Sequence, residues 1–113
     1  MAAIVPYQAV YQVLKEVIER EDVITYGELS DRYEERTGTR IHWRNWAPAL
    51  DYVGAWSRRL GLPCIAAVVV SRQLGMPGDR FFGRTRMSRS AKREKWRRLL
   101  RRVYDAAWPE TMT

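Results

Sequence analysis

Apolar side chains recur at helical spacing in the first part of the chain. Residues 6–20 carry apolar positions three and four residues apart, which predicts a first helix. A second, shorter helix is predicted over residues 26–36. It begins at Thr25 and Glu28, which have the spacing of a capping box, and Gly38 is placed to end it.

A third helix is predicted over residues 45–60, with Asn45 as its cap. Its buried stripe is expected to comprise Trp46, Ala49, Val53, Trp56 and Leu60. Its opposite face carries Pro48, Tyr52, Ala55 and Arg59, with Asp51 and Arg58 beside it. This second face is the one expected to meet solvent or a partner.

The continuous apolar run over residues 65–70 ends in three valines and predicts a buried strand. Turn residues fill positions 71–78, and residues 79–82 are expected to pair back as a short second strand. The pattern therefore predicts a hairpin with Arg72 and Arg80 near its tip. A hairpin that follows three helices is the arrangement of a winged helix.

The last predicted helix runs to about Trp108 and is capped by Ser88 or Ser90. Its apolar stripe comprises Trp96, Leu99, Leu100, Val103, Tyr104 and Ala107. Basic residues surround the apolar side of its first turns, which are therefore expected to project from the body. Residues 109–113 are predicted to be a frayed tail.

The net charge of +7 adds an anionic partner to this picture. Residues 1–83 carry ten basic and ten acidic side chains, whereas residues 84–113 carry ten basic and three acidic ones. The excess is therefore a property of the C-terminal segment. It favours nucleic acid first, and an acidic protein or membrane surface second.

No catalytic or metal-binding pattern is apparent. His42 is the only histidine and Cys64 the only cysteine, and neither has partners at ligand spacing. Cys64 lies among apolar residues, which favours core packing over reactivity. We therefore expect no enzyme activity, no cofactor and no metal. The absence of an apolar segment long enough to span a bilayer, and of a signal-peptide pattern, predicts a cytoplasmic protein without membrane association, located at the nucleoid if the source is bacterial.

Three segments resemble one protein family. They are Val13-Leu14-Lys15, Ile24-Thr25-Tyr26-Gly27-Glu28-Leu29-Ser30, and Val53-Gly54-Ala55-Trp56-Ser57-Arg58-Arg59 followed by Leu62-Pro63. This order resembles the winged-helix DNA-binding domain of O6-alkylguanine-DNA alkyltransferases and alkyltransferase-like proteins. The resemblance implies DNA contact near Thr25 and Tyr26.

The chemistry of that family does not carry over. Its alkyl-accepting cysteine lies in a P-C-H-R motif, whereas Pro63-Cys64 is followed by Ile65-Ala66 here. By position, the motif would fall near residues 67–70, which are apolar. The arginine that the family inserts into the duplex would fall near Asp51, which has the opposite charge.

Together these patterns predict one domain of α+β class, a winged helix-turn-helix-like body over residues 1–83. A basic amphipathic helix over residues 84–108 and the tail 109–113 complete it. We expect non-enzymatic binding of DNA, or of RNA, mainly through phosphates. The expected contact residues are Thr25, Tyr26, Arg44, Tyr52, Arg58, Arg59, Arg72, Arg80, Arg84, Arg86, Arg89, Lys92, Arg93, Arg97 and Arg101.

Two alternatives remain open at this point. The neutral body and its aromatic residues also suit an adaptor or inhibitor that binds a nucleic-acid enzyme or its complex. The resemblance alone suggests a sensor of alkylated DNA without chemistry. The target sequence, the partner, the oligomeric state and the pathway are not predicted by these patterns.

Overall fold

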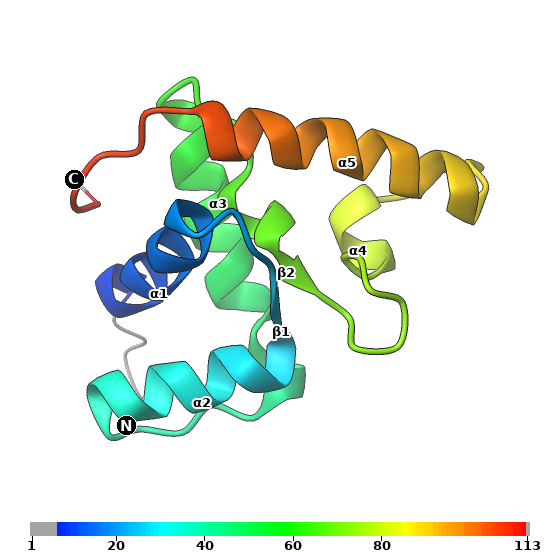
Figure 1. Ribbon diagram of the computed structural model, residues 1–113. Coiled ribbons are helices and arrows are strands. Elements are labelled where there is room, and N and C mark those ends of the chain that lie inside the picture. Colours follow the sequence, from blue (N-terminus) through cyan, green and yellow to red (C-terminus); the bar gives the residue numbers. More distant parts are fainter. Residues whose placement is uncertain (1–6, 113) are drawn as a thin grey trace.

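The computed structural model describes residues 7–112, and they form a mostly helical α+β domain (Figure 1). A two-stranded parallel sheet lies among the helices. In chain order the elements are α1 (Tyr7–Glu19), β1 (Ile24–Thr25), α2 (Tyr26–Thr37), the 3₁₀ turn η1 (Trp43–Asn45), α3 (Ala47–Arg59), the 3₁₀ turn η2 (Ile65–Val68), β2 (Val69–Val70), α4 (Asp79–Phe82) and α5 (Arg89–Asp105).

The centre of the core is η2, which packs against α1, α3 and α5. Ile65, Ala67 and Val68 of this turn are fully buried. Apolar residues of α1 close over them, because that helix buries the stripe that its sequence spacing predicts. The helices therefore cover a short central segment instead of a large sheet.

The predicted capping box of α2 is confirmed. The Thr25 hydroxyl accepts from the Glu28 amide and the Glu28 carboxylate accepts from the Thr25 amide, both at 3.1 Å. Gly38 ends the helix in the left-handed region, with φ of 77°, as predicted. The start of α2 is thus fixed beside the strands, where Tyr26 faces the candidate site.

The cap predicted for α3 is wrong. Asn45 belongs to η1, and Trp46 occupies the N-cap position without a side-chain hydrogen bond. The predicted buried stripe is correct except for Leu60, which is 48% exposed. Leu60 lies after the last residue of α3, where the chain turns away at Gly61 with φ of 78°.

The predicted hairpin is also wrong. The first part of the apolar run forms η2, and only Val69–Val70 is extended, paired in parallel with Ile24–Thr25. Residues 79–82 form α4, not a returning strand. A short, fully buried apolar run suits a strand or a helical turn equally well, and here the partner strand comes from before α2. No hairpin wing is present in residues 63–83.

The helix α5 starts at the predicted Ser88 cap, whose hydroxyl accepts from the Ala91 amide at 3.1 Å, and it ends at Asp105, three residues before the predicted end. The Trp96 indole anchors it to the core by donating to the Ala67 carbonyl oxygen at 2.7 Å.

The segment after α5 is bonded to α1 instead of fraying. The Tyr11 hydroxyl donates to the Pro109 carbonyl oxygen, and the Gln12 amide donates to that of Glu110 at 2.7 Å. Gln8 donates to the carbonyl oxygen of Met112 and accepts from its amide. The described ends of the chain are therefore joined.

Candidate nucleic-acid interface

The first turns of α5 are held against α4 and the preceding loop. Lys92 pairs with Asp79 at 3.4 Å, and the Arg93 guanidinium donates to the Leu74 carbonyl oxygen at 3.0 Å. Both cations are only partly exposed. The prediction that these turns project from the body is wrong, and Lys92 and Arg93 are structural contacts of the protein itself.

Two further predicted contact residues have acidic partners. Arg101 pairs with Glu21 at 3.3 Å and with Asp105 at 3.1 Å. Arg80 pairs with Asp51 at 2.6 Å, and this hydrogen bond raises the pKa of the Arg80 guanidinium above its ordinary value. Both arginines are exposed, so a phosphate can reach them. It must, however, compete with the carboxylates that already pair with them.

Arg58 is exposed on α3, and its guanidinium lies 3.5 Å from the Cys64 thiol. Cys64 is 8% exposed and packs against Gly54, where an added Cβ would lie 3.0 Å from its sulfur. The prediction of core packing for Cys64 is therefore confirmed.

The other predicted arginines are exposed and have no carboxylate partner within residues 7–112. They are Arg44, Arg59, Arg72, Arg84, Arg86, Arg89 and Arg97. These seven cations are free to bind an anion.

The outward face of α5 carries a basic group that the sequence interpretation missed. Lys95, Arg98 and Arg102 are exposed and, among the described residues, have no acidic partner. They repeat at i, i+3 and i+7, on the side of the helix opposite the buried Trp96 and Leu100. Their position on the helix relative to that apolar stripe could have identified them from the sequence. We call Lys95, Arg98 and Arg102 the α5 stripe.

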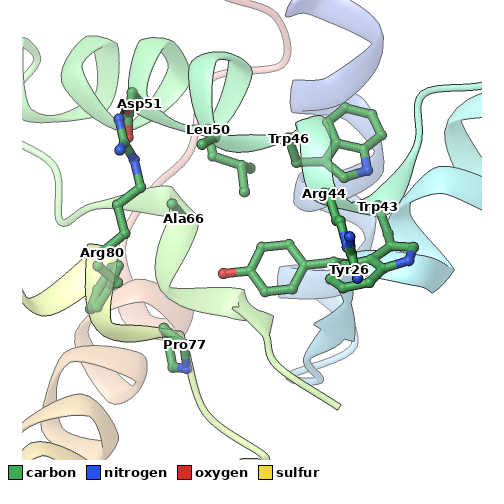
Figure 2. Close-up of a pocket in the computed structure, with 11 residues that line it drawn as sticks. Tyr26, Trp43, Arg44, Trp46, Leu50, Asp51, Ala66, Pro77 and Arg80 are labelled. Carbon is green, nitrogen blue, oxygen red and sulfur yellow. Dashed lines mark hydrogen bonds and ion pairs between the residues drawn. The ribbon is translucent and has the colours of Figure 1, made fainter. Parts of the chain in front are cut away.

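A second candidate surface lies where α2 begins. Two neighbouring hollows, of about 280 and 850 Å³, share Tyr26 and Trp43 as a common wall. Figure 2 shows the residues that line the smaller one. The smaller hollow also has Arg44 and Arg80 in its lining. The larger one is lined by Thr25 and other residues at the start of α2, and by the loop residues Ser71, Arg72 and Gln73. We call this region the Trp43 surface.

Trp43 is the most exposed large apolar side chain among the described residues, at 49%. The Arg44 guanidinium lies 4.9 Å from the centre of its ring, and the His42 ring stacks at 5.6 Å. The His42 Nδ1 also accepts from the Arg44 amide at 3.2 Å. A partner would therefore meet an exposed indole whose position is set by its two sequence neighbours.

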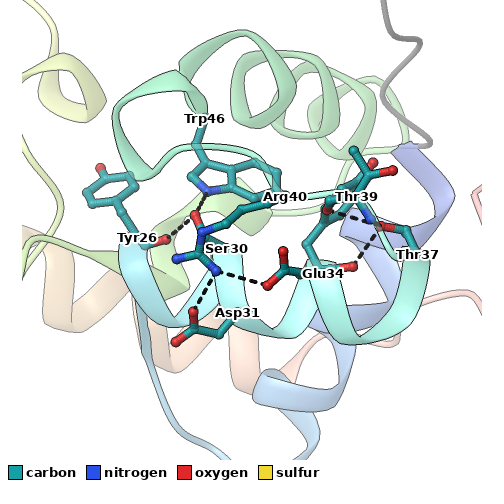
Figure 3. A network of polar contacts seen from close by, with 9 residues as sticks. Tyr26, Ser30, Asp31, Glu34, Thr37, Thr39, Arg40 and Trp46 are labelled. Carbon is teal, nitrogen blue, oxygen red and sulfur yellow. Dashed lines mark hydrogen bonds and ion pairs between the residues drawn. The ribbon is translucent and has the colours of Figure 1, made fainter.

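Polar contacts hold the N-cap residue of α3 and the loop after α2 against α2 (Figure 3). The buried Trp46 indole donates to the Ser30 hydroxyl at 2.8 Å, and Ser30 donates to the Tyr26 carbonyl oxygen at 3.3 Å. Arg40 bridges Asp31 and Glu34 at 3.1 and 3.2 Å. These contacts fix the segments on either side of Trp43 to α2, and they therefore help to position the Trp43 surface.

The predicted contact residues do not form one continuous surface. Thr25, Tyr26, Arg44 and Arg72 lie at the Trp43 surface, but no residue of α5 lines either of its hollows. In Figure 1, α5 runs along one side of the molecule and α2 along the opposite side. Tyr52, on the outer face of α3, is 46% exposed and stacks on Tyr7 with ring centres 3.9 Å apart.

Comparison of the chain with protein-family models, with curated proteins and with solved structures found no significant match. Among the described residues, no three His, Cys, Asp or Glu side chains are grouped to hold a metal ion. None of the helices in that part of the chain has the length and apolar character needed to cross a membrane.

Proposed function

We propose that this protein is a non-enzymatic DNA-binding protein that contacts phosphates mainly through α5. The observation that carries this proposal is the α5 stripe, in which three exposed cations without acidic partners follow one helix face. Seven residues of helix place Lys95 and Arg102 about 10 Å apart along the axis, a span over which a DNA strand presents several phosphates. Arg89 and Arg97 are also exposed on α5, but they lie at other phases of the helix.

The arrangement of two successive helices, without the wing, is a further part of the proposal. α2 and α3 follow one another and are joined by nine residues that include η1, and Tyr52 and Arg59 on α3 are exposed. The resemblance of residues 24–30 and 53–59 to alkyltransferase-like proteins supports a role for α2 and α3 in DNA binding.

The test is a fluorescence-anisotropy titration of a labelled duplex between 50 and 200 mM salt. Each phosphate contact contributes about 0.9 to the slope of log affinity against log salt. Changing Lys95, Arg98 and Arg102 together to Ala should therefore reduce the magnitude of that slope by about 2.7.

The matched control changes Lys15, Arg32 and Arg36 to Ala, because these three cations lie on α1 and α2, line neither hollow of the Trp43 surface, and alter the net charge equally when lost. This control should leave the slope near the wild-type value. Absence of duplex binding at 50 mM salt would refute the proposal. Equal slopes in the two triple variants would refute the role of the α5 stripe.

A protein adaptor is the second candidate, favoured by the exposed Trp43 beside Arg44, since tryptophan and arginine are enriched at the centres of protein interfaces. It predicts no duplex binding at low salt. The same titration therefore separates the two functions.

A further inference from the structure

Among the residues that the structure describes, two groups of cations without acidic partners lie apart from one another. The α5 stripe is on one side of the molecule, and Arg44 and Arg72 are at the Trp43 surface, on the side where α2 begins (Figure 1). The buried turn η2 packs against the inner face of α5, and its following strand β2 pairs with β1 just before α2. The core therefore separates the two surfaces, and a ligand on α5 leaves the Trp43 surface accessible.

The acidic groups near the Trp43 surface are already engaged. The Glu28 carboxylate accepts from the Thr25 amide in the capping box, and Asp31 pairs with Arg40. By contrast, Arg72 has no carboxylate partner in the part of the chain that the structure describes. The larger hollow therefore offers one free cation, together with the polar side chains of Ser71 and Gln73.

The composition of this surface distinguishes between the nucleic acids it suits. Two free arginines are few for the closely spaced phosphates of a duplex, whose bases are also hidden in the stack. An unpaired base exposes its flat face, and stacking on an exposed tryptophan binds it with little dependence on sequence. A base that stacks on Trp43 takes the place of the Arg44 guanidinium, which lies 4.9 Å from the ring centre. Arg44 can then move to a neighbouring phosphate, and Arg72, in the lining of the other hollow, can bind a second one.

We propose that the Trp43 surface is a second nucleic-acid site, which binds a single strand by stacking a base on Trp43 while the α5 stripe holds a duplex. This inference rests on the proposed DNA-binding function and adds a second ligand to it. The protein would then join a duplex to a single strand, as at a junction between paired and unpaired DNA.

The first test measures the affinity for a labelled oligothymidylate of about 12 nucleotides, a length within the range of one small binding site. Trp43→Ala should weaken this affinity about 5- to 150-fold, the loss expected for one stacked base, and leave duplex affinity unchanged. Trp43→Phe should retain most of it. Tyr52→Ala is the matched control, because Tyr52 is similarly exposed but lines neither hollow.

Arg72→Ala provides an independent variant that leaves the aromatic wall intact. It should lower the salt slope for the single strand by about 0.7, the contribution of one phosphate. An oligothymidylate affinity within twofold of wild type for Trp43→Ala, or an equal loss for Tyr52→Ala, would overturn the inference. If Trp43→Ala does not fold, an unchanged slope for Arg72→Ala would overturn it equally.

The second test asks whether both ligands bind at once. Beads that carry a duplex should capture labelled oligothymidylate only when the protein is added. The Lys95→Ala, Arg98→Ala, Arg102→Ala variant should bind the duplex more weakly than the wild type but retain its affinity for the oligothymidylate. Duplex binding without capture, or loss of both ligands in this variant, would overturn the second site and leave the proposed function standing. Failure of the wild type to bind duplex would refute the proposed function itself.

Discussion

The hydrogen bond between Trp46 and Ser30 shows how one residue pair positions the candidate site. Both side chains are buried, and the bond joins the start of α3 to the middle of α2. Ser30→Ala would leave the indole N–H without this partner in the core. We expect the free energy of unfolding to fall by about 1–3 kcal/mol, the cost of an unsatisfied buried donor.

Urea unfolding of a double-mutant cycle measures this effect. Trp46→Phe removes the donor, so Ser30→Ala should cost much less in that background than in the wild type. Equal costs in the two backgrounds would show that the hydrogen bond is not the source of the loss.

Two glycines in helices differ in what surrounds them, which gives a prediction at the scale of the element. A Cβ at Gly54 in α3 would lie 3.0 Å from the Cys64 sulfur, whereas a Cβ at Gly27 in α2 would meet nothing within 4 Å. Neither residue has positive φ. Gly27→Ala should therefore stabilise the protein by about 0.4–1 kcal/mol through the unfolded state.

Gly54→Ala should instead destabilise it, because overpacking a closed core costs about 1–3 kcal/mol. The two midpoints of thermal unfolding should thus move in opposite directions. Adding Cys64→Ala, which removes the crowded sulfur, should reduce the cost of Gly54→Ala. If Gly54→Ala stabilised the protein, the prediction would be wrong, and α3 and η2 would be able to move apart without a cost in folding free energy.

Helices with strong apolar periodicity were predictable, whereas the segment between α3 and α5 was not. Local signals determine α1, the capping box at Thr25 and the cap at Ser88. The fate of the apolar run after Cys64 depends instead on β1, a partner more than 40 residues earlier in the chain. A long-range pairing of two residues leaves no periodic pattern in the sequence, so the hairpin prediction failed.

For the candidate site, features set by helical phase were predictable from the sequence, whereas contacts between separate elements were not. Exposure of Tyr52 and Arg59 follows from the phase of α3, and the phase of α5 would have identified the α5 stripe. The pairing of Arg80 with Asp51 and the bond from Arg93 to the Leu74 carbonyl oxygen join separate elements. Only the tertiary structure could therefore show which cations are already occupied.

At the scale of the whole molecule, contacts between α1 and the segment after α5 close the chain. Tyr11 is central to them, because its ring is buried against Trp56 and its hydroxyl donates to the Pro109 carbonyl oxygen. Burial, and secondarily the charge of Glu19, raise the pKa of Tyr11 to about 12 from its ordinary value of 10.0. Folding therefore favours the protonated hydroxyl.

Because of this raised pKa, the folded protein should lose stability at alkaline pH. A raised folded-state pKa contributes stability that is present below pH 10 and is lost as the pH rises through about 12. The free energy of unfolding should thus fall more steeply from pH 8 to pH 11 in the wild type than in Tyr11→Phe, which has no hydroxyl to titrate. Urea midpoints at pH 8, 10 and 11 measure this, with pH 8 as the baseline. Parallel profiles would contradict the prediction, because they would mean that folding leaves the pKa of Tyr11 unchanged.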